Sequence, residues 1–174
     1  MATVSIEQLA GHDVFAGMDA ADLGRLASAA RPVDFPAGRR LFDEGGTADR
    51  FWIIQDGAVA LDLHLPDRGT LIVETLGTGE IVGWSWLFPP YRWRFGAVAT
   101  RPVRALEFDA RLVRFLWALD PRLAQQLTRR FAEVVVERLQ ATRMRLLDLY
   151  GDATRTLSDK TRTLSDNSRT PPGG

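Results

Sequence analysis

The sequence predicts a mainly β fold: an antiparallel jelly-roll β-barrel with short helices before it and a long helix after it. Three observations support this class. Short strand-like segments alternate with glycine turns between residues 31 and 109, helical periodicity appears on both sides of that region, and 45% of the 174 residues are hydrophobic. Many short strands at such spacing are typical of a closed barrel or jelly roll, and the length provides one domain with accessory segments.

Residues 1–30 are expected to form a helical lead-in. Segments 6–12 and 20–29 have the pattern of short helices, and apolar residues recur at helical spacing in the second. Asp19 stands directly before the second segment and suits an N-cap, because its carboxylate accepts hydrogen bonds from the first backbone N–H groups. Pro32 ends this region.

Residues 31–109 are expected to form the barrel. Glycine-containing turns separate the strands, and Asp56-Gly57 is a hairpin signal because glycine accepts a positive φ. In segment 58–65 the leucines lie on one face and Asp62 on the other. The expected strands are 33–35, 40–42, 51–54, 58–65, 70–76, 81–82, 97–99 and 103–108.

Residues 110–150 are expected to be helical. A short helix over 110–119 is followed by Asp120-Pro121, an N-cap with proline at the first helical position. A long helix then runs from Pro121 to Tyr150, roughly 45 Å at about 1.5 Å per residue, with Gly151 as its C-cap. It packs on the barrel or forms a parallel homodimer seam, and its length favours the homodimer. Its apolar stripe comprises Leu123, Leu127, Phe131, Val135, Leu139, Leu146 and Leu149.

Residues 151–174 are expected to be a disordered tail. TRTLSDK at 154–160 is nearly repeated by TRTLSDN at 161–167, and each unit holds one apolar residue, whereas a coiled-coil seam needs two per heptad. The chain then ends in Pro-Pro-Gly-Gly. Such a composition buries too little apolar surface to fold.

The composition excludes several classes of protein. The formal net charge is zero and the pI is near 6.7, so neither nucleic acid nor an anionic membrane is the expected partner. The chain has no cysteine, which removes disulfides, thiolate metal sites and cysteine nucleophiles. The N-terminus is not a secretory signal, and no apolar run approaches the roughly 20 residues of a membrane span. A cytoplasmic protein is expected.

Catalysis is not expected either. His12 and His64 are the only histidines, whereas metal enzymes on such barrels need histidines and carboxylates that converge on the interior. Ser85 stands in no G-x-S-x-G turn. We therefore predict no enzyme activity, no metal and no cofactor.

The stretch from Gly79 to Val98, GEIVGWSWLFPPYRWRFGAV, carries the strongest functional signal. A glycine turn, a short apolar-aromatic segment, a Pro-Pro break and an arginine lead into a strand. This order presents backbone N–H groups and one guanidinium to a small anion. Arg94 is either the anchor of that anion or a surface arginine at the barrel rim, and the anchor is favoured. Arg92 is expected to be a solvated loop residue.

Three of the five tryptophans crowd into this stretch, namely Trp84, Trp86 and Trp93. They either pack the loop over the barrel mouth or form a stacking surface for a purine or another apolar ligand. A short loop can hardly bury three indoles completely, so both interpretations stay open.

Segment 14–150 resembles a cyclic nucleotide-binding domain of the catabolite-activator type, the type of the cAMP receptor protein and the fumarate-nitrate regulator. VFAGMDAADLGRLASAA is similar to the entry helices of this family, and FPAGRRLFDEGGTADRFWIIQDGAVAL is similar to its first strands. GTGEIVGWSWLF is similar to the opening of its phosphate-binding cassette. Arg94 follows Gly83 by 94 − 83 = 11 residues, which is the spacing of the cassette arginine.

The resemblance implies how a ligand is held. Free N–H groups of a short helix after the cassette glycine bind the cyclic phosphate together with the arginine. A glutamate just after the glycine accepts from the ribose 2′-hydroxyl, and the base packs against the barrel and the long helix. The ligand-binding residues implied here are Gly83, Trp84, Ser85, Trp86, Arg94, Phe95 and, where the helix meets the base, Thr142.

Two positions depart from the family's pattern. Trp84 stands at the glutamate position, and Phe95 stands where a small or hydroxyl residue follows the arginine. If the register slides so that Gly79-Glu80 supplies the glutamate, the cassette becomes 94 − 79 = 15 residues long, which is too long. The register that begins at Gly83 is therefore preferred.

The expected function is a sensor or regulatory module that binds cyclic AMP, cyclic GMP or a related anion. Binding would be transmitted through the helix from Pro121 to Tyr150 of a homodimer. A transcription regulator of this family continues into a winged helix-turn-helix, whereas 24 residues follow Tyr150, so direct DNA binding is not expected. The alternative is a degenerate domain that binds no nucleotide and docks a protein through its tryptophan-rich loop and long helix.

Overall fold

The computed structural model describes residues 4–167, with side chains in the last helix only as far as Met144 and at Leu147. The chain divides into two compact units, 1–128 and 129–174. The first unit contains the strands, the short helices and the beginning of the last helix.

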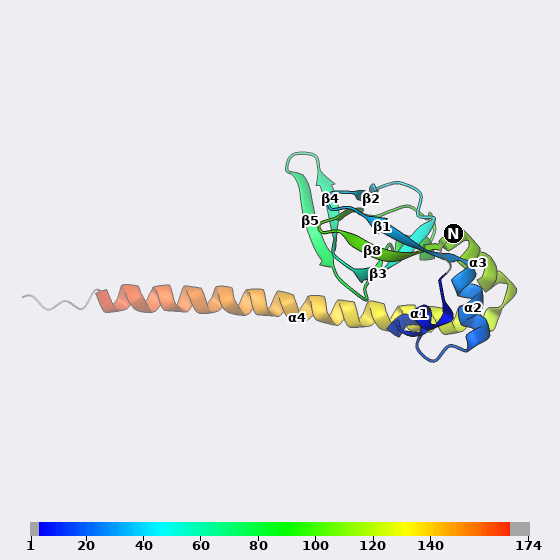
Figure 1. Ribbon diagram of the computed structural model, residues 1–174. Coiled ribbons are helices and arrows are strands. Elements are labelled where there is room, and N and C mark those ends of the chain that lie inside the picture. The colour runs from blue at the N-terminus through cyan, green and yellow to red at the C-terminus, as the bar shows by residue number, and fades with distance from the viewer. Residues whose placement is uncertain (1–3, 168–174) are drawn as a thin grey trace, which may run out of the picture. The chain divides into compact units, whose positions relative to one another are not determined.

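Eight strands form two four-stranded antiparallel sheets (Figure 1). The first sheet has the order β1 (Ala30–Phe35), β8 (Val103–Asp109), β3 (Arg50–Asp56) and β6 (Ile81–Val82). The second has the order β2 (Arg40–Phe42), β7 (Gly96–Ala99), β4 (Val59–Leu65) and β5 (Gly69–Leu76). The predicted fold class is confirmed, with one correction. Within residues 4–167, hydrogen bonding keeps two separate sheets, so the domain is a jelly roll and not a closed barrel, because β2 and β6 are too short to bridge the edges.

The lead-in helices begin where side chains cap them. In α1 (Ile6–Ala10) the Ser5 hydroxyl accepts from the Gln8 N–H and the Gln8 side chain accepts from the Ser5 N–H, which is a capping box. A 3-10 turn, η1 (Asp13–Phe15), follows. In α2 (Ala20–Ser28) the Asp19 carboxylate accepts from the Asp22 N–H at 2.8 Å, as predicted. β1 begins at Ala30, two residues before Pro32, so the strand starts earlier than the sequence suggested.

Adjacent residues of β3 carry aromatic side chains to opposite faces of the first sheet, because side chains alternate along a strand. Phe51 stacks on Phe108 with ring centroids 4.6 Å apart and on Trp86 at 4.7 Å. Trp52 stacks on Phe42 of the other sheet at 5.4 Å, so its face lies between the two sheets. β3 therefore organises two aromatic clusters, one outside the sheets and one between them.

A buried carboxylate fixes the orientation of Trp52. The Trp52 indole N–H donates to Glu107 Oε2 at 2.9 Å, and the side chain of Glu107 is only 8% exposed. Arg31 Nε donates to Glu107 Oε1 at 2.8 Å, and Arg50 Nη1 lies 3.4 Å from the same oxygen. Both arginines also offset the negative charge of the carboxylate, which would be costly to bury alone.

Two helices follow the last strand. α3 (Ala110–Leu119) is capped by Asp109, which accepts from the N–H groups of Arg111 and Leu112. α4 (Pro121–Asn167) begins at the predicted place, because Asp120 Oδ1 accepts from the N–H groups of Arg122 and Leu123 at 3.0 and 3.2 Å. No helix within residues 4–167 is long and apolar enough to cross a membrane.

The C-terminal end of α4 corrects the sequence prediction. The helix passes through Gly151, the expected C-cap, and continues to Asn167, through the segment expected to be disordered. One glycine costs about 1 kcal/mol in a helix interior, and the Thr, Arg, Leu, Ser, Asp and Lys residues of the two repeats are all compatible with helix. Residues 168–174 lie outside the described residues.

The apolar stripe of α4 changes its burial along the helix. Leu123 and Leu127 in the first unit are completely buried, whereas Val135 and Leu139 in the second unit are 46% and 48% exposed. The side chains of Leu146 and Leu149 lie outside those that the structure describes.

The junction of α2 and α4 should make stability depend on pH. A hydrogen bond from the Arg25 side chain is the main cause that lowers the pKa of Asp120 below its usual 3.8, and the N–H of Leu123 is the next. A lowered pKa means that stability is complete above the usual value and is lost as the pH falls through the lowered one. Because asparagine also caps helices, Asp120→Asn should lose less stability than the wild type as the pH falls from about 5 to about 2.

Urea denaturation at a series of pH values measures this difference. Asp67→Asn, in the exposed turn between β4 and β5, is the control and should retain the wild-type pH dependence. If the unfolding free energy of Asp120→Asn falls with pH as steeply as that of the wild type, the Asp120 carboxylate does not contribute to the pH dependence.

Candidate functional site: a cassette between β6 and β7

The segment that connects β6 to β7 begins with a backbone conformation that requires glycine. Gly83 has φ +90°, and a Cβ there would lie 2.8 Å from Trp93 Cζ3 and 3.0 Å from Trp93 Cη2. The indole therefore packs directly on the Cα of Gly83, which no other residue permits. The two ends of the segment are brought together by this contact.

The first turn of the segment is η2 (Ser85–Leu87), a single 3-10 turn preceded by the half-buried Trp84. The Leu87 N–H donates to the Trp84 carbonyl at 3.1 Å. Ser85 Oγ accepts from the backbone N–H of Arg94 at 3.3 Å, which is a second link between the beginning and the end of the cassette. The short helix implied by the family resemblance is thus present, in 3-10 form.

Trp86 is a core residue. Its side chain is completely buried and packs on Phe51 of β3 and on Trp117 of α3, with ring centroids 4.7 and 5.3 Å apart. Arg114 of α3 donates to the Trp86 carbonyl at 3.0 Å, and its guanidinium lies 4.5 Å from the centroid of the Tyr91 ring. The packing interpretation therefore describes Trp86, and α3 holds the cassette from outside.

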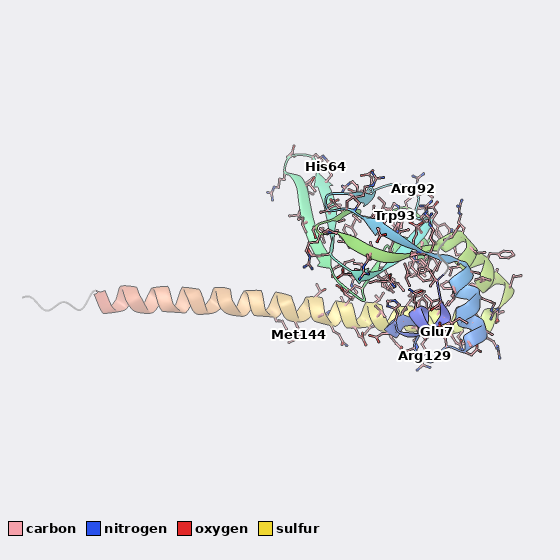
Figure 2. The ribbon with its side chains drawn as sticks, viewed as in Figure 1. Glu7, His64, Arg92, Trp93, Arg129 and Met144 are labelled. Atoms are coloured by element: carbon pink, nitrogen blue, oxygen red, sulfur yellow. The ribbon has the colours of Figure 1, made fainter. Side chains whose placement is uncertain are left out.

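Trp93 is the second buried tryptophan, at 5% exposure. Its indole stacks on Phe42 with centroids 3.9 Å apart and lies 6.0 Å from Trp52, so it belongs to the aromatic cluster between the sheets. Figure 2 labels Trp93 and Arg92 near β2, at the same side of the two sheets. The prediction that the loop could not bury all three indoles completely is correct, because Trp84 is only half-buried.

Backbone hydrogen bonds join the C-terminal arm of the cassette to the loop between β2 and β3. The Trp93 N–H donates to the Gly46 carbonyl at 2.9 Å, and the Gly45 N–H donates to the Trp93 carbonyl at 2.8 Å. The Ala48 N–H donates to the Tyr91 carbonyl at 2.7 Å. This antiparallel pairing makes the arm rigid. Because side chains alternate along an extended segment, Trp93 lies inside, whereas Arg92 and Arg94 on either side of it are exposed to solvent.

The two arginines differ in their contacts. Arg92 donates through Nη1 to the Gly45 carbonyl at 2.9 Å, so it stabilises the loop pairing and is not merely solvated as expected. Arg94 is exposed, and among residues 4–167 its guanidinium has no hydrogen-bond or ion-pair partner. A charged group held at the end of a rigid arm, with its donors open, is able to receive an anion.

A buried ion pair lies beside the end of the cassette, and the sequence did not reveal it. Arg40 donates to both oxygens of Asp62 at 2.7 and 2.9 Å, and the Asp62 side chain is 6% exposed. A Cβ on Gly96 would lie 2.3 Å from Asp62 Oδ1, so the strand after Phe95 must begin with glycine. A bulge between Leu61 and Asp62 accompanies this arrangement. The only sequence signal was a carboxylate within a leucine-rich strand.

Two residues named from the sequence make hydrogen bonds within their own segments. Thr142 belongs to the second unit, where its hydroxyl donates to the Arg138 carbonyl at 2.9 Å within α4. Glu80 lies in the turn before β6 and accepts from the Gly77 N–H at 2.6 Å. Because Glu80 caps its own turn, the alternative register that used it as a ribose acceptor has no support from the geometry.

Within residues 4–167, no group of three or more histidine, cysteine, aspartate or glutamate side chains is arranged to hold a metal ion. The chemistry that the site offers is therefore that of an arginine, backbone N–H groups and aromatic faces. The arginine and the N–H groups can bind an anion, and the aromatic faces can stack on a planar ring.

Comparison with known proteins identifies the class. The family model described as "Cyclic nucleotide-binding domain" matches residues 32–119, half of the chain. The chain belongs to this family, which is a family of regulatory domains. The match includes the whole cassette, from Gly83 to Gly96.

Two curated relatives carry the description "CRP-like cAMP-activated global transcriptional regulator", from Mycobacterium tuberculosis strains CDC 1551 / Oshkosh and ATCC 25618 / H37Rv. Each is 32% identical to this chain over 143 residues, which are 82% of this chain and 62% of the relative. The chain thus spans less than two thirds of these relatives.

Solved structures show the same fold. A protein from Geobacter metallireducens GS-15 that is named for cyclic nucleotide binding has a TM-score of 0.72 at 29% identity, over 78% of this chain and 98% of that one. A cyclic nucleotide-binding domain from Methylobacillus flagellatus KT has a TM-score of 0.67 at 21% identity, over 76% and 75% of the two chains. The second likeness concerns the fold alone.

The contact between Gly83 and Trp93 predicts a measurable difference between two glycines. Gly83→Ala and Gly79→Ala both place a side chain at positive φ (+90° and +85°), but a Cβ on Gly79 would meet nothing within 4 Å. Both should therefore lose about 1–2 kcal/mol of unfolding free energy from the backbone term. Gly83→Ala should lose about 1–3 kcal/mol more, because the indole must move.

Denaturant unfolding of the two variants tests this expectation. Equal destabilisation would show that the indole does not rest on Gly83.

Proposed function

We propose that this protein is a ligand-sensing regulatory module in which the segment from Gly83 to Gly96 binds a cyclic nucleotide, such as cyclic AMP or cyclic GMP, or a related anion. The observation that carries the proposal is the guanidinium of Arg94, which has no partner among the described side chains and lies eleven residues after Gly83 (94 − 83 = 11) on an arm fixed by backbone hydrogen bonds. No catalytic step, metal or cofactor is part of the proposal, and we place its action in the cytoplasm.

The replacement at Trp84 sets an expectation for affinity. An indole cannot accept a hydrogen bond from a ribose 2′-hydroxyl, and a buried hydroxyl without its partner loses about 1–3 kcal/mol. That corresponds to roughly 5- to 150-fold in affinity. Nucleotide binding is therefore expected to be weaker than in a cassette that has a glutamate at this position.

Contacts of α3 provide a route from the cassette to α4. Arg114 joins α3 to the cassette through the Trp86 carbonyl and the Tyr91 ring. Asp120 connects α3 directly to α4 and is itself bound by Arg25 of α2 at 2.9 Å. A ligand that displaces the cassette would also displace α3 through these contacts. It would thereby favour one of two positions of α3 and of the helices that it contacts.

Arg94→Ala tests the binding site. Calorimetric titration of the full chain with cyclic AMP and with cyclic GMP should show binding that falls at least about 10-fold in the variant, because a charge-assisted hydrogen bond contributes about 1.5–3 kcal/mol. Arg101→Ala, an exposed arginine in the turn before β8, is the matched control and should bind as the wild type does. If Arg94→Ala binds as well as the wild type, Arg94 is not the anchor.

A homodimer through α4 is the second part of the proposal. From Val135 onward, several large apolar side chains of α4 are about half exposed, which is unusual for a helix that remains alone in water. They are Val135 (46%), Val136 (51%), Leu139 (48%), Met144 (58%) and Leu147 (63%). Three residues separate Val136 from Leu139 and Met144 from Leu147, a spacing that places the members of each pair on the same face of a helix.

Leu139→Glu should weaken the homodimer, because it places a charge in the seam. Light scattering coupled to gel filtration should then show monomer at protein concentrations where the wild type is a dimer. Gln140→Glu adds the same charge at the adjacent exposed position and should remain a dimer. A wild type that is monomeric at high concentration would overturn this part.

A docking module remains the second candidate, and one observation favours it. Phe88 at the tip of the cassette is 68% exposed and is followed by the exposed Pro89 and Pro90. Because Trp86 and Trp93 are buried, the surface available to a partner protein would be this tip. If no cyclic nucleotide binds and Phe88→Ser releases a co-purifying partner that Arg94→Ala retains, the docking function is supported.

A further inference from the structure

We propose that Trp93 is an internal occupant of the ligand site, which restricts the size of the ligand that the cassette accepts. The inference rests on the proposed function, because it concerns the same cassette. It assigns a specificity-determining role to a residue that the family resemblance did not single out.

The indole fills the space between the cassette and the wall of the second sheet. On one side its six-membered ring touches Gly83, where a Cβ would lie 2.8 Å from Cζ3. On the other side it is stacked on Phe42 of β2 at 3.9 Å and 19°. At 5% exposure, almost no part of the ring remains open to solvent.

This arrangement is the one that a bound aromatic ring would adopt. A planar ring entering between Gly83 and the barrel wall would stack on Phe42, because offset stacking of aromatic faces is favourable and Phe42 is the exposed end of the stack once Trp93 is removed. Behind Phe42 the stack continues to Trp52 at 5.4 Å, and Trp52 is fixed by its hydrogen bond to Glu107. The wall is therefore rigid, and a second ring cannot share the space with Trp93.

The charged part of the site remains open while the ring space is filled. Arg94 follows Trp93 directly, and its exposed guanidinium points away from the cluster because neighbouring residues of an extended arm alternate. The wild-type site thus has an available cation beside a filled aromatic slot. A compact anion has access to Arg94, whereas a nucleotide whose base enters the slot must first displace Trp93.

Truncation of Trp93 tests the inference by calorimetry on the full chain. Trp93→Ala should bind cyclic AMP at least about 10-fold more tightly than the wild type, and the gain should vanish in Trp93→Ala/Arg94→Ala. The affinity for inorganic phosphate should stay within about threefold in Trp93→Ala, because the indole does not cover Arg94. Phe115→Ala, which truncates an exposed aromatic side chain of α3 (57% exposed), should show no gain for cyclic AMP.

Free indole provides a second measurement that does not depend on anion binding. A truncated site lined by Phe42, Trp52 and Gly83 should bind indole, and indole at about 1 mM should raise the thermal midpoint of Trp93→Ala but not that of the wild type. If Trp93→Ala does not fold, as judged by circular dichroism, Trp93→Leu replaces it in both measurements, with a smaller gain expected.

The outcomes separate the inference from the proposed function. A folded Trp93 variant that binds cyclic AMP no better than the wild type, that gains equally for phosphate, or that is not stabilised by indole overturns the inference. A failure of the proposed function appears elsewhere, as equal ligand affinity of the wild type and Arg94→Ala.

Discussion

The contact between the Trp93 indole and Gly83 is the constraint on which the arrangement of the cassette depends. It requires a residue without Cβ at a positive φ, and it draws the end of the segment onto its beginning. The backbone of Trp93 is held at the same time by Gly45 and Gly46. This backbone pairing keeps the arm extended, and the alternation of side chains along it leaves Arg94 outside.

The cassette is held from two sides because β3 has aromatic residues on both faces. Phe51 receives Trp86 on the helix side, and Trp52 leads through Phe42 to Trp93 between the sheets. Two tryptophans of one loop are thus anchored in two different clusters. Trp86 thereby connects the cassette to α3, and Trp93 connects it to the second sheet.

Membership of the cyclic nucleotide-binding family and the details of this site point in different directions. The family match and the spacing of Arg94 support an anion site. Trp84, Phe95 and the buried Trp93 occupy positions where a nucleotide would need an acceptor, a small residue and free space. The proposed site, with an open guanidinium and a filled aromatic slot, agrees with both sets of observations: its charge would attract the ligand and its packing would select the ligand's size.

The sequence by itself determined the jelly-roll class, the order of the strands along the chain, the caps at Asp19 and Asp120 and the position of Arg94, because turns, caps and periodicity are local signals. It could not determine the burial of Trp86 and Trp93 or the Arg40–Asp62 pair, because these contacts join residues that are far apart in the sequence. It also ended the last helix too early at Gly151, where one glycine is tolerated within a long helix. Which side chains of the cassette are buried was decided only when the two sheets and the cassette packed together.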